Sequence, residues 1–204
     1  MNSPASSAEN LHGSAPDTHN TALLLIDVIN ALDFPEADEL LPHALAAARR
    51  IAALRERARK AGIPCVYVND NFGRWRSDFR EVVKACSAQG VRGRPLVDLL
   101  RPAEDDYFVL KPKHSGFFSS SLELLLEKLG SRELVLAGFA GNICVLFTAN
   151  DAYMRDFKLY VPQDCCASNS PHDNEHALRQ MRLLLKARTE PSELLRFGAE
   201  GVSI

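Results

Sequence analysis

The chain reads Leu134-Val135-Leu136-Ala137-Gly138-Phe139-Ala140-Gly141-Asn142-Ile143-Cys144-Val145 where an apolar run stops at glycine and a helix-like segment, 145–155, begins. The continuous run 134–137 is typical of a strand buried on both faces, and the change of period after it predicts a strand-to-helix turn. A cysteine in such a turn has its sulfur near unpaired backbone N–H groups and the positive end of the helix dipole, which favour the thiolate. Cys144 is therefore a candidate nucleophile. The alternative is an inert, small core residue.

Two other apolar runs end in a charged residue. The runs 23–26 and 107–110 precede Asp27 and Lys111. Both have the length of a strand, and their continuous hydrophobicity favours a parallel sheet covered on both faces. Because ligand sites of such sheets lie beyond the carboxyl ends of the strands, we expect Asp27, Lys111 and Cys144 at one edge. The alternatives are an aspartate that caps its own loop and a solvated surface lysine.

Apolar and amphipathic segments alternate along the rest of the chain. This order predicts an α/β fold, a three-layer doubly wound (Rossmann-like) and mainly parallel sheet of about six strands, in a single domain over residues 21–204. We expect a variable region from 70 to 102 and a short helix near 191–197. The predicted strands are 22–27, 64–69, 107–111, 133–137 and 159–162, and the predicted helices are 37–61, 120–129, 142–157 and 174–188.

Composition narrows the class of protein. The chain has 204 residues, a length that suits one domain with a large core. Its formal net charge of −2 does not favour binding to nucleic acid or to an anionic membrane. We therefore expect a small-molecule substrate. The five cysteines include no Cys-x-x-Cys pair and form no secreted-domain framework, which favours a reducing cytoplasm. No run is long enough to span a bilayer, and residues 1–20 lack the features of a signal peptide, so we predict a flexible tail there.

Three motifs carry a family resemblance. They are LLLIDVIN around Asp27, VLKPKHSGFF around Lys111 and LAGFAGNICVLFTANDAYMRDFKLYVPQDCCAS around Cys144. With these motifs in this order, the chain resembles the isochorismatase-like cysteine hydrolases, which include nicotinamidases, N-carbamoylsarcosine amidohydrolases and ureidoacrylate hydrolases. The resemblance implies the isochorismatase-like hydrolase fold, a homo-oligomer (dimer or tetramer) and a catalytic triad of Asp27, Lys111 and Cys144. Lys111 is preferred over Lys113 because it stands four residues before Ser115. The resemblance also implies a cis peptide bond between Ala140 and Gly141.

The chemistry of these residue types fits the hydrolysis of a small amide, carbamoyl or ureido compound. Cys144 would attack the carbonyl carbon, Asp27 would act as the base, and Lys111 would stabilise the thiolate. The backbone N–H groups of Gly141 and Cys144 are the expected oxyanion donors, since glycine lets the chain approach the ligand closely. Two alternatives stay open: hydrolysis of a vinyl ether, as in true isochorismatases, against which the cysteine argues, and a catalytically silent binding or assembly protein.

The segment after the second strand is expected to set specificity. Nicotinamidases carry a metal-binding Asp-x-His here, whereas Asp70 is followed by Asn71 and Phe72, so we expect neither a metal nor another cofactor. The segment instead offers two arginines around a tryptophan, which suit a planar or anionic group unless they pair with Asp78. His114 is expected to be structural or to lie at the edge of the pocket. The proposed substrate-binding residues are Arg74, Trp75 and Arg76, with Phe34, Phe117 and Phe118 as candidate walls of the pocket.

Overall fold

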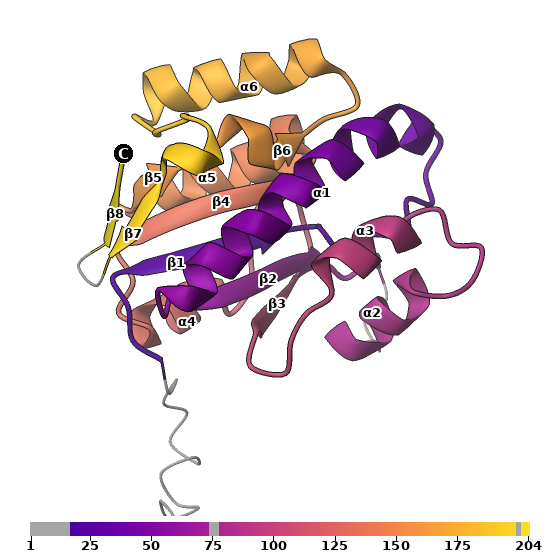
Figure 1. Ribbon diagram of the computed structural model, residues 1–204, viewed down its shortest axis with the longest axis horizontal. Helices are drawn as coiled ribbons and strands as arrows, with labels where there is room; N and C mark the ends of the chain where they lie inside the picture. Colours follow the sequence, from indigo (N-terminus) through magenta and orange to yellow (C-terminus); the bar gives the residue numbers. More distant parts are fainter. Residues whose placement is uncertain (1–16, 74–77, 199–200) are drawn as a thin grey trace, which may run out of the picture.

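A six-stranded sheet forms the middle of the molecule in the computed structural model, which describes residues 17–73, 78–198 and 201–204 (Figure 1). Its strands lie in the order β3-β2-β1-β4-β5, and the short β6 pairs with the far end of β4. Each pairing between these strands is parallel. The strands are β1 (Thr21–Ile26), β2 (Cys65–Asp70), β3 (Tyr107–Lys111), β4 (Glu133–Phe139), β5 (Lys158–Tyr160) and β6 (Cys166–Ala167).

The central strands are buried on both faces, as their continuous hydrophobicity predicts. Every residue of β1 and β4 is buried. In the middle of the sheet, Leu25 of β1 is in register with Tyr67 of β2 and Ala137 of β4. Because all these strands run the same way, their carboxyl ends meet at one edge of the sheet.

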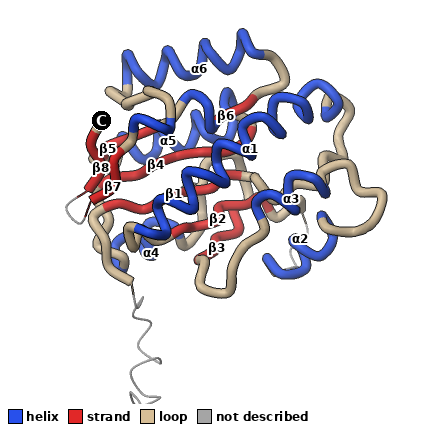
Figure 2. The backbone as a smooth tube through the Cα atoms, viewed as in Figure 1, coloured by secondary structure: helices blue, strands red, loops and turns tan. Residues whose placement is uncertain are grey.

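Helices cover both faces of the sheet (Figures 1 and 2). Leu23 and Leu25 of β1 join the core shared with α1, α2 and α3, whereas Leu24 and Ile26 join the core shared with α4, α5 and α6. This alternation establishes the three-layer doubly wound fold. In the described residues, no helix is both long enough and apolar enough to cross a membrane. The helices are α1 (Ala37–Lys60), α2 (Phe79–Cys86), α3 (Arg94–Leu100), α4 (Leu122–Lys128), α5 (Leu146–Tyr153) and α6 (Pro171–Leu184).

Local capping explains where some helices differ from expectation. The variable region contains α2 and α3, and α2 begins after Asp78, whose Oδ1 accepts a hydrogen bond from the Glu81 N–H at 2.9 Å. Helix α6 begins three residues earlier than expected, because Ser170 is its N-cap and Pro171 suits the first helical position.

The short helix expected near 191–197 is confirmed only as a single 3₁₀ turn, and the rest of the C-terminal segment is mostly extended. A single 3₁₀ turn, η4 (Ser192–Leu194), leads into an antiparallel pair, β7 (Arg196–Gly198) and β8 (Gly201–Ser203). The N–H of Val202 donates to Glu133 Oε2 at 2.8 Å, which fixes β8 beside the start of β4. A hydrogen bond between segments so far apart in the chain leaves no local signal in the sequence.

The packed part of the chain includes residues that were expected to belong to a tail. Residues 1–16 of that tail lie outside the described residues. From Asp17 onward the chain is bonded to the domain: Asp17 accepts a hydrogen bond from the Tyr107 hydroxyl at 2.9 Å, and the His19 N–H donates to the Leu129 carbonyl at 2.9 Å. The domain in the structure therefore begins several residues before β1.

Candidate active site

The sheet brings Asp27, Lys111 and Cys144 together at its carboxyl edge. Asp27 directly follows β1, Lys111 is the last residue of β3, and Cys144 lies in a π-helical turn, η2 (Gly141–Val145), that joins β4 to α5. The Lys111 Nζ is 2.8 Å from Asp27 Oδ2 and 3.6 Å from Cys144 Sγ. The three expected residues therefore form one contact group.

The backbone of neighbouring segments holds Asp27 and Lys111 in place. Asp27 has a positive φ of 51°, and its own N–H donates to the Val68 carbonyl of β2 at 3.0 Å. Its Oδ1 accepts a hydrogen bond from the Asp70 N–H at 2.7 Å, which leaves Oδ2 for Lys111. The Lys111 ammonium also donates to the Lys113 carbonyl at 3.1 Å, while the Lys113 side chain is exposed.

The charge state of the site depends on burial and on the contacts between its charged groups. Lys111 is fully buried, Asp27 is 5% exposed, and Cys144 is partly exposed. Burial raises the pKa of the Asp27 carboxyl, against the opposing effect of Lys111. For Lys111, burial acts to lower the pKa of the ammonium, but its interactions with Asp27, Cys144 and Asp70 together raise it above its ordinary value. Lys111 is therefore a cation, and Asp27 is a stronger base than a solvated aspartate.

The thiol of Cys144 is protonated in the free site, which corrects the expectation that the turn favours a thiolate. Burial raises the pKa of Cys144 to about 12, and the negative charge of Asp27 adds to this, while Lys111 opposes it. The Lys111 ammonium contacts both the Asp27 carboxylate and the Cys144 sulfur, so a base lies beside the thiol. The arrangement can form the thiolate by proton transfer within the site.

The turn before the nucleophile contains the cis peptide bond one position earlier than expected. The bond joins Phe139 to Ala140, and the bond between Ala140 and Gly141 is not among the cis bonds of the described residues. Strand pairing runs through Phe139, which is in register with Ala167, and the π-helical turn begins at Gly141. The change of direction therefore falls directly after Phe139. The Ala140 carbonyl then accepts from the Ile143 and Val145 N–H groups at 3.1 and 3.2 Å.

The expected substrate-binding residues are only partly placed near this edge. Arg74, Trp75 and Arg76 lie outside the described residues. Phe34 is partly buried and packs against the core on the α1 side of the sheet. Phe117 is 5% exposed and belongs to the opposite core, where its ring is 5.9 Å from that of Phe157. The structure thus places Phe117 in the core, because its ring fills the space between the sheet and its helices.

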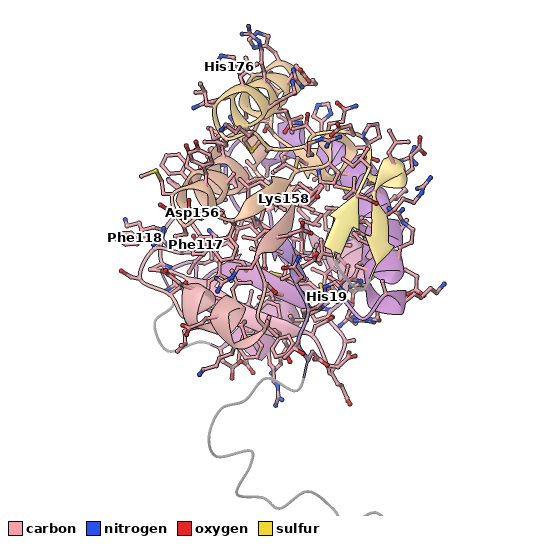
Figure 3. All side chains as sticks on the ribbon, turned by 90° about the vertical axis from the view of Figure 1, so that its left-hand side faces the viewer. His19, Phe117, Phe118, Asp156, Lys158 and His176 are labelled. Carbon is pink, nitrogen blue, oxygen red and sulfur yellow. The ribbon has the colours of Figure 1, made fainter. Side chains whose placement is uncertain are left out.

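Phe118, next to Phe117, is 54% exposed and lies on the surface of the molecule (Figure 3). Neither phenylalanine forms part of the contact group around Cys144.

Two further side chains lie beside the contact group. Asp70 Oδ2 is 3.5 Å from the Lys111 Nζ, and Asp70 is the last residue of β2. The position of Asp70 at a strand end was a usable signal for this second carboxylate. His114, expected to be structural or at the edge of the pocket, has its Nδ1 4.0 Å from Cys144 Sγ, and its ring contacts Phe147 at 5.4 Å between centroids. Among the described residues, no group of three or more His, Cys, Asp or Glu side chains could hold a metal ion.

Comparison with known proteins agrees with the fold and the motifs. Residues 21–190 match the model of the isochorismatase domain. The chain is 41% identical over 172 residues to the uncharacterized isochorismatase family protein YaaI of Bacillus subtilis, covering 84% of this chain and 94% of that protein. It is 30% identical over 167 residues to the ureidoacrylate amidohydrolase RutB of Azorhizobium caulinodans, covering 67% and 71% of the two chains.

A solved structure shows the same architecture. N-carbamoylsarcosine amidase from Thermoplasma acidophilum superposes with a TM-score of 0.66 at 26% identity, covering 85% of this chain and 97% of that one. The domain match spans more than half of the chain and includes Asp27, Lys111 and Cys144. The chain therefore belongs to the isochorismatase family of hydrolases.

Proposed function

We propose that the protein is a cysteine-dependent hydrolase of a small amide, carbamoyl or ureido compound. The observation that carries this proposal is the position of the Lys111 ammonium, 2.8 Å from the Asp27 carboxylate and 3.6 Å from the Cys144 sulfur. A buried base, a buried cation and a partly exposed thiol in contact are the parts that acyl transfer through a thioester needs. The ureidoacrylate amidohydrolase and N-carbamoylsarcosine amidase relatives support this choice of substrate class.

In the first half of the reaction, Asp27 takes the thiol proton as the Cys144 sulfur attacks the carbonyl carbon. The new C–S bond pushes the electron pair of the C=O bond onto oxygen, where the N–H groups of Gly141 and Cys144 stabilise it. The pair returns as the C–N bond breaks, and the amine leaves with the proton that Asp27 held. Lys111 balances the negative charge of the thiolate and the carboxylate throughout.

In the second half, water attacks the carbonyl carbon of the thioester. Asp27 removes a proton from the water, the C–S bond breaks, and the proton returns to the sulfur. The acid product leaves, and the thiol form of Cys144 is restored. The raised pKa of the Asp27 carboxyl suits this step, because a stronger base withdraws the proton of water more readily.

The finer parts of the proposal concern recognition, assembly and location. Arg74 or Arg76 binds an anionic group of the substrate, beside Trp75. The protein works in the cytoplasm as a homo-oligomer on a small molecule. Vinyl ether hydrolysis is the less favoured alternative, because it gives no role to a thiol that contacts the Lys111 ammonium beside the Asp27 carboxylate.

The test is ammonia release from a panel of primary amides, carbamoyl compounds and ureido compounds. We expect wild type to release ammonia from some of them and Cys144→Ala to lose more than about 10³-fold of the rate, because the variant lacks the sulfur that forms the proposed covalent intermediate. Cys86→Ala is the matched control, since Cys86 is a buried cysteine in α2, and it should keep the activity. Ammonia release that survives in Cys144→Ala would contradict the proposal. Silence of wild type, together with slow alkylation of Cys144 by iodoacetamide at all pH values, would favour the silent binding protein.

A further inference from the structure

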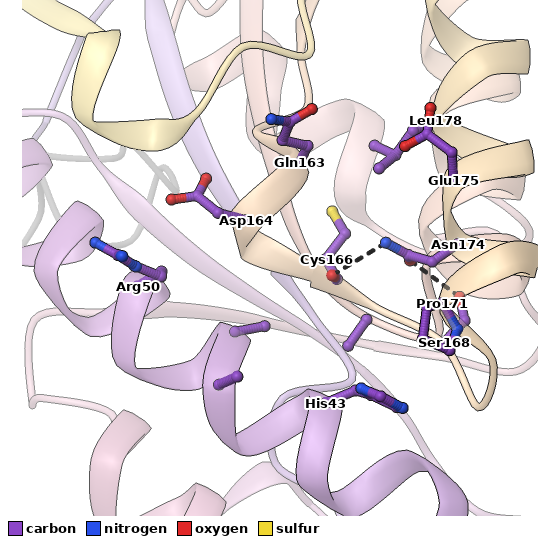
Figure 4. A pocket seen from close by; sticks show the side chains of 13 residues that line it. His43, Arg50, Gln163, Asp164, Cys166, Ser168, Pro171, Asn174, Glu175 and Leu178 are labelled. Atoms are coloured by element: carbon purple, nitrogen blue, oxygen red, sulfur yellow. Dashed lines mark hydrogen bonds between the residues drawn. The ribbon is translucent and has the colours of Figure 1, made fainter.

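Two polar side chains lie directly behind the turn that carries Cys144. Ser168 follows β6, and Asn174 lies in the first turn of α6. Both contribute to the wall of a cavity of about 480 Å³ between α1 and α6 (Figure 4). Because β6 pairs with β4 at Gly138 and Phe139, this wall is attached to the strand that leads into the turn.

A chain of hydrogen bonds with a fixed direction runs from Asn174 to the turn. The Asn174 Nδ2 donates to the Cys166 carbonyl at 3.3 Å, which orients the amide so that its Oδ1 faces Ser168. The Ser168 hydroxyl donates to this Oδ1 at 3.0 Å, as Figure 4 shows. The lone pairs of Ser168 Oγ are then free to accept, and they receive the Asn142 N–H at 3.0 Å. Ser168 is 1% exposed, so solvent does not compete for this bond.

Gly141 fits against the same pair. A Cβ atom on Gly141 would lie 2.1 Å from Asn174 Oδ1 and 3.2 Å from Ser168 Oγ. A side chain at position 141 would therefore displace the Asn174 amide, which gives the glycine a role besides the close approach of the ligand expected from the sequence. The turn is thus held at two successive residues, through contact at Gly141 and through a hydrogen bond at Asn142.

We propose that Ser168 and Asn174 are positioning residues that direct the backbone N–H groups of the nucleophile turn toward the substrate oxygen. The proposal rests on the proposed function. Asn142 lies between Gly141 and Cys144, whose N–H groups are the proposed oxyanion donors, so anchoring Asn142 fixes the direction of both. Neither Ser168 nor Asn174 has a contact with Asp27 or Lys111 among the hydrogen bonds and ion pairs of the described residues. Their loss should therefore weaken oxyanion binding while the thiol and its base stay intact.

A small aldehyde measures the oxyanion donors without any need for turnover. The Cys144 sulfur adds to the aldehyde carbon, the electron pair of the C=O bond moves to oxygen, and the oxygen takes up the thiol proton, so that a reversible thiohemiacetal forms. Its oxygen occupies the position of the oxyanion. Bound aldehyde blocks iodoacetamide, so the protection of Cys144 reports the affinity. Iodoacetamide itself has no carbonyl addition step and reports the thiol alone.

The experiment compares Ser168→Ala with wild type, using propionaldehyde and intact-protein mass spectrometry at mildly alkaline pH. Ser131→Ala is the matched control, because Ser131 is also 1% exposed and its hydroxyl donates to the His19 carbonyl at the opposite edge of the sheet. Asn174→Ala is a second variant that should fold, since the removed atoms face an open cavity and leave no closed void.

We expect Ser168→Ala and Asn174→Ala to need about 10-fold more aldehyde for the same protection of Cys144, because the oxyanion donors are no longer aligned. Without aldehyde, both variants should be alkylated at the same rate as wild type. The Ser131→Ala variant should match wild type. Equal protection in wild type and both variants would overturn the positioning role and leave the proposed function standing. If the two variants lost both alkylation rate and melting temperature, the role of Ser168 and Asn174 would be merely structural, and the proposed positioning role would also be overturned. Absence of protection in wild type itself would overturn the oxyanion site and, with it, both proposals.

Discussion

At the scale of single residues, the charge of Asp27 has two opposite effects on Cys144. It provides the base that removes the thiol proton, and it also raises the pKa of the thiol, which Lys111 alone would lower. We predict that Asp27→Asn abolishes hydrolysis but makes Cys144 react faster with iodoacetamide near neutral pH. The reason is that the neutral amide no longer opposes thiolate formation, while Lys111 still stabilises it. The measurement is the alkylation rate of Cys144 as a function of pH.

Lys111→Met provides the comparison for that prediction. Removing the ammonium takes away the group that lowers the pKa of Cys144, so the alkylation rate should fall at every pH below about 12. The variant also leaves the Asp27 carboxylate buried without its partner, which should cost about 3–5 kcal/mol of stability, as breaking a buried pair does. Slower alkylation of Cys144 in Asp27→Asn than in wild type would contradict the conclusion that the charge of Asp27 raises the pKa of the thiol.

The positions of the three reacting residues could be predicted from the sequence, but their charge state could not. Asp27 and Lys111 directly end apolar runs, and parallel strands align such ends without any detailed geometry. The pKa of Cys144 depends on how deeply the sulfur is buried and on its distance from Asp27, which no local pattern encodes. For the same reason, Ser168 and Asn174 were not identified. They contact the turn across the β6–α6 connection. Ser168 is the last residue of the motif around Cys144 but stands 24 positions after the cysteine, and Asn174 lies outside the motif, so no local pattern links either side chain to the turn.

At the scale of elements, Glu133 joins several strands at the amino edge of the sheet. Its carboxylate contacts Lys158 Nζ of β5 at 2.8 Å, the Val202 N–H of β8 at 2.8 Å and the Thr21 hydroxyl of β1 at 3.1 Å. Burial acts to raise the pKa of the Glu133 carboxyl. These partners lower the pKa by a larger amount, so that it lies below its ordinary value of 4.5. The carboxylate form is therefore the one that stabilises the fold.

We predict that Glu133→Gln lowers the free energy of unfolding by about 1–3 kcal/mol near neutral pH, as expected for lost hydrogen bonds to a charged group. A lowered folded-state pKa gives stability that is present above the unfolded value of 4.5 and is lost as pH falls through the folded value. The difference in unfolding free energy between wild type and Glu133→Gln should therefore shrink as the pH falls below 4.5. Urea denaturation at several pH values measures it, with Glu127→Gln on the exposed surface of α4 as the control. A difference that stays constant on acidification would rule out the ionised form as the source.

The elements that could be predicted are those whose signal is local. β1, β2 and β3 match their expected ranges to within one residue at each end, and so does α1. The hairpin of β7 and β8 was missed because its position depends on Glu133, more than sixty residues away. Ser170 and Pro171 are a local capping signal for the start of α6, so this start is predictable from the sequence although the expected range begins at 174.

At the scale of the whole molecule, stability and chemistry lie at opposite edges of one sheet. The contact group of Asp27, Lys111 and Cys144 stands at the carboxyl edge, whereas Glu133 and the C-terminal hairpin stand at the amino edge. Figure 1 shows this hairpin beside the end of the sheet where β1 begins. The buried strands β1 and β4 lie between the two edges. Changes at Glu133 should therefore lower stability without altering the alkylation rate of Cys144.

The outer face of the π-helical turn and α5 carries the feature that bears on assembly. Ile143 lies in the π-helical turn, Phe147 in α5 and Met154 directly after α5. Their spacings place them on one side, and they are 40%, 51% and 77% exposed. Exposed apolar side chains that gather on one face mark interaction surfaces more often than isolated ones do. The same helix carries Cys144, so a partner subunit on this face would also border the active site.

We predict that the protein sediments as a dimer or tetramer of its 22.5 kDa chain and that Met154→Lys shifts it toward the monomer. The added charge would have to be buried against the apolar face of a neighbouring subunit, which is costly without a partner of opposite charge. Analytical ultracentrifugation measures the mass. Leu183→Lys is the matched control, because Leu183 is 61% exposed on α6, and it should leave the mass unchanged. A monomeric wild type would contradict the prediction, and dissociation by Leu183→Lys alone would move the interface to α6 and away from the helix that carries the nucleophile.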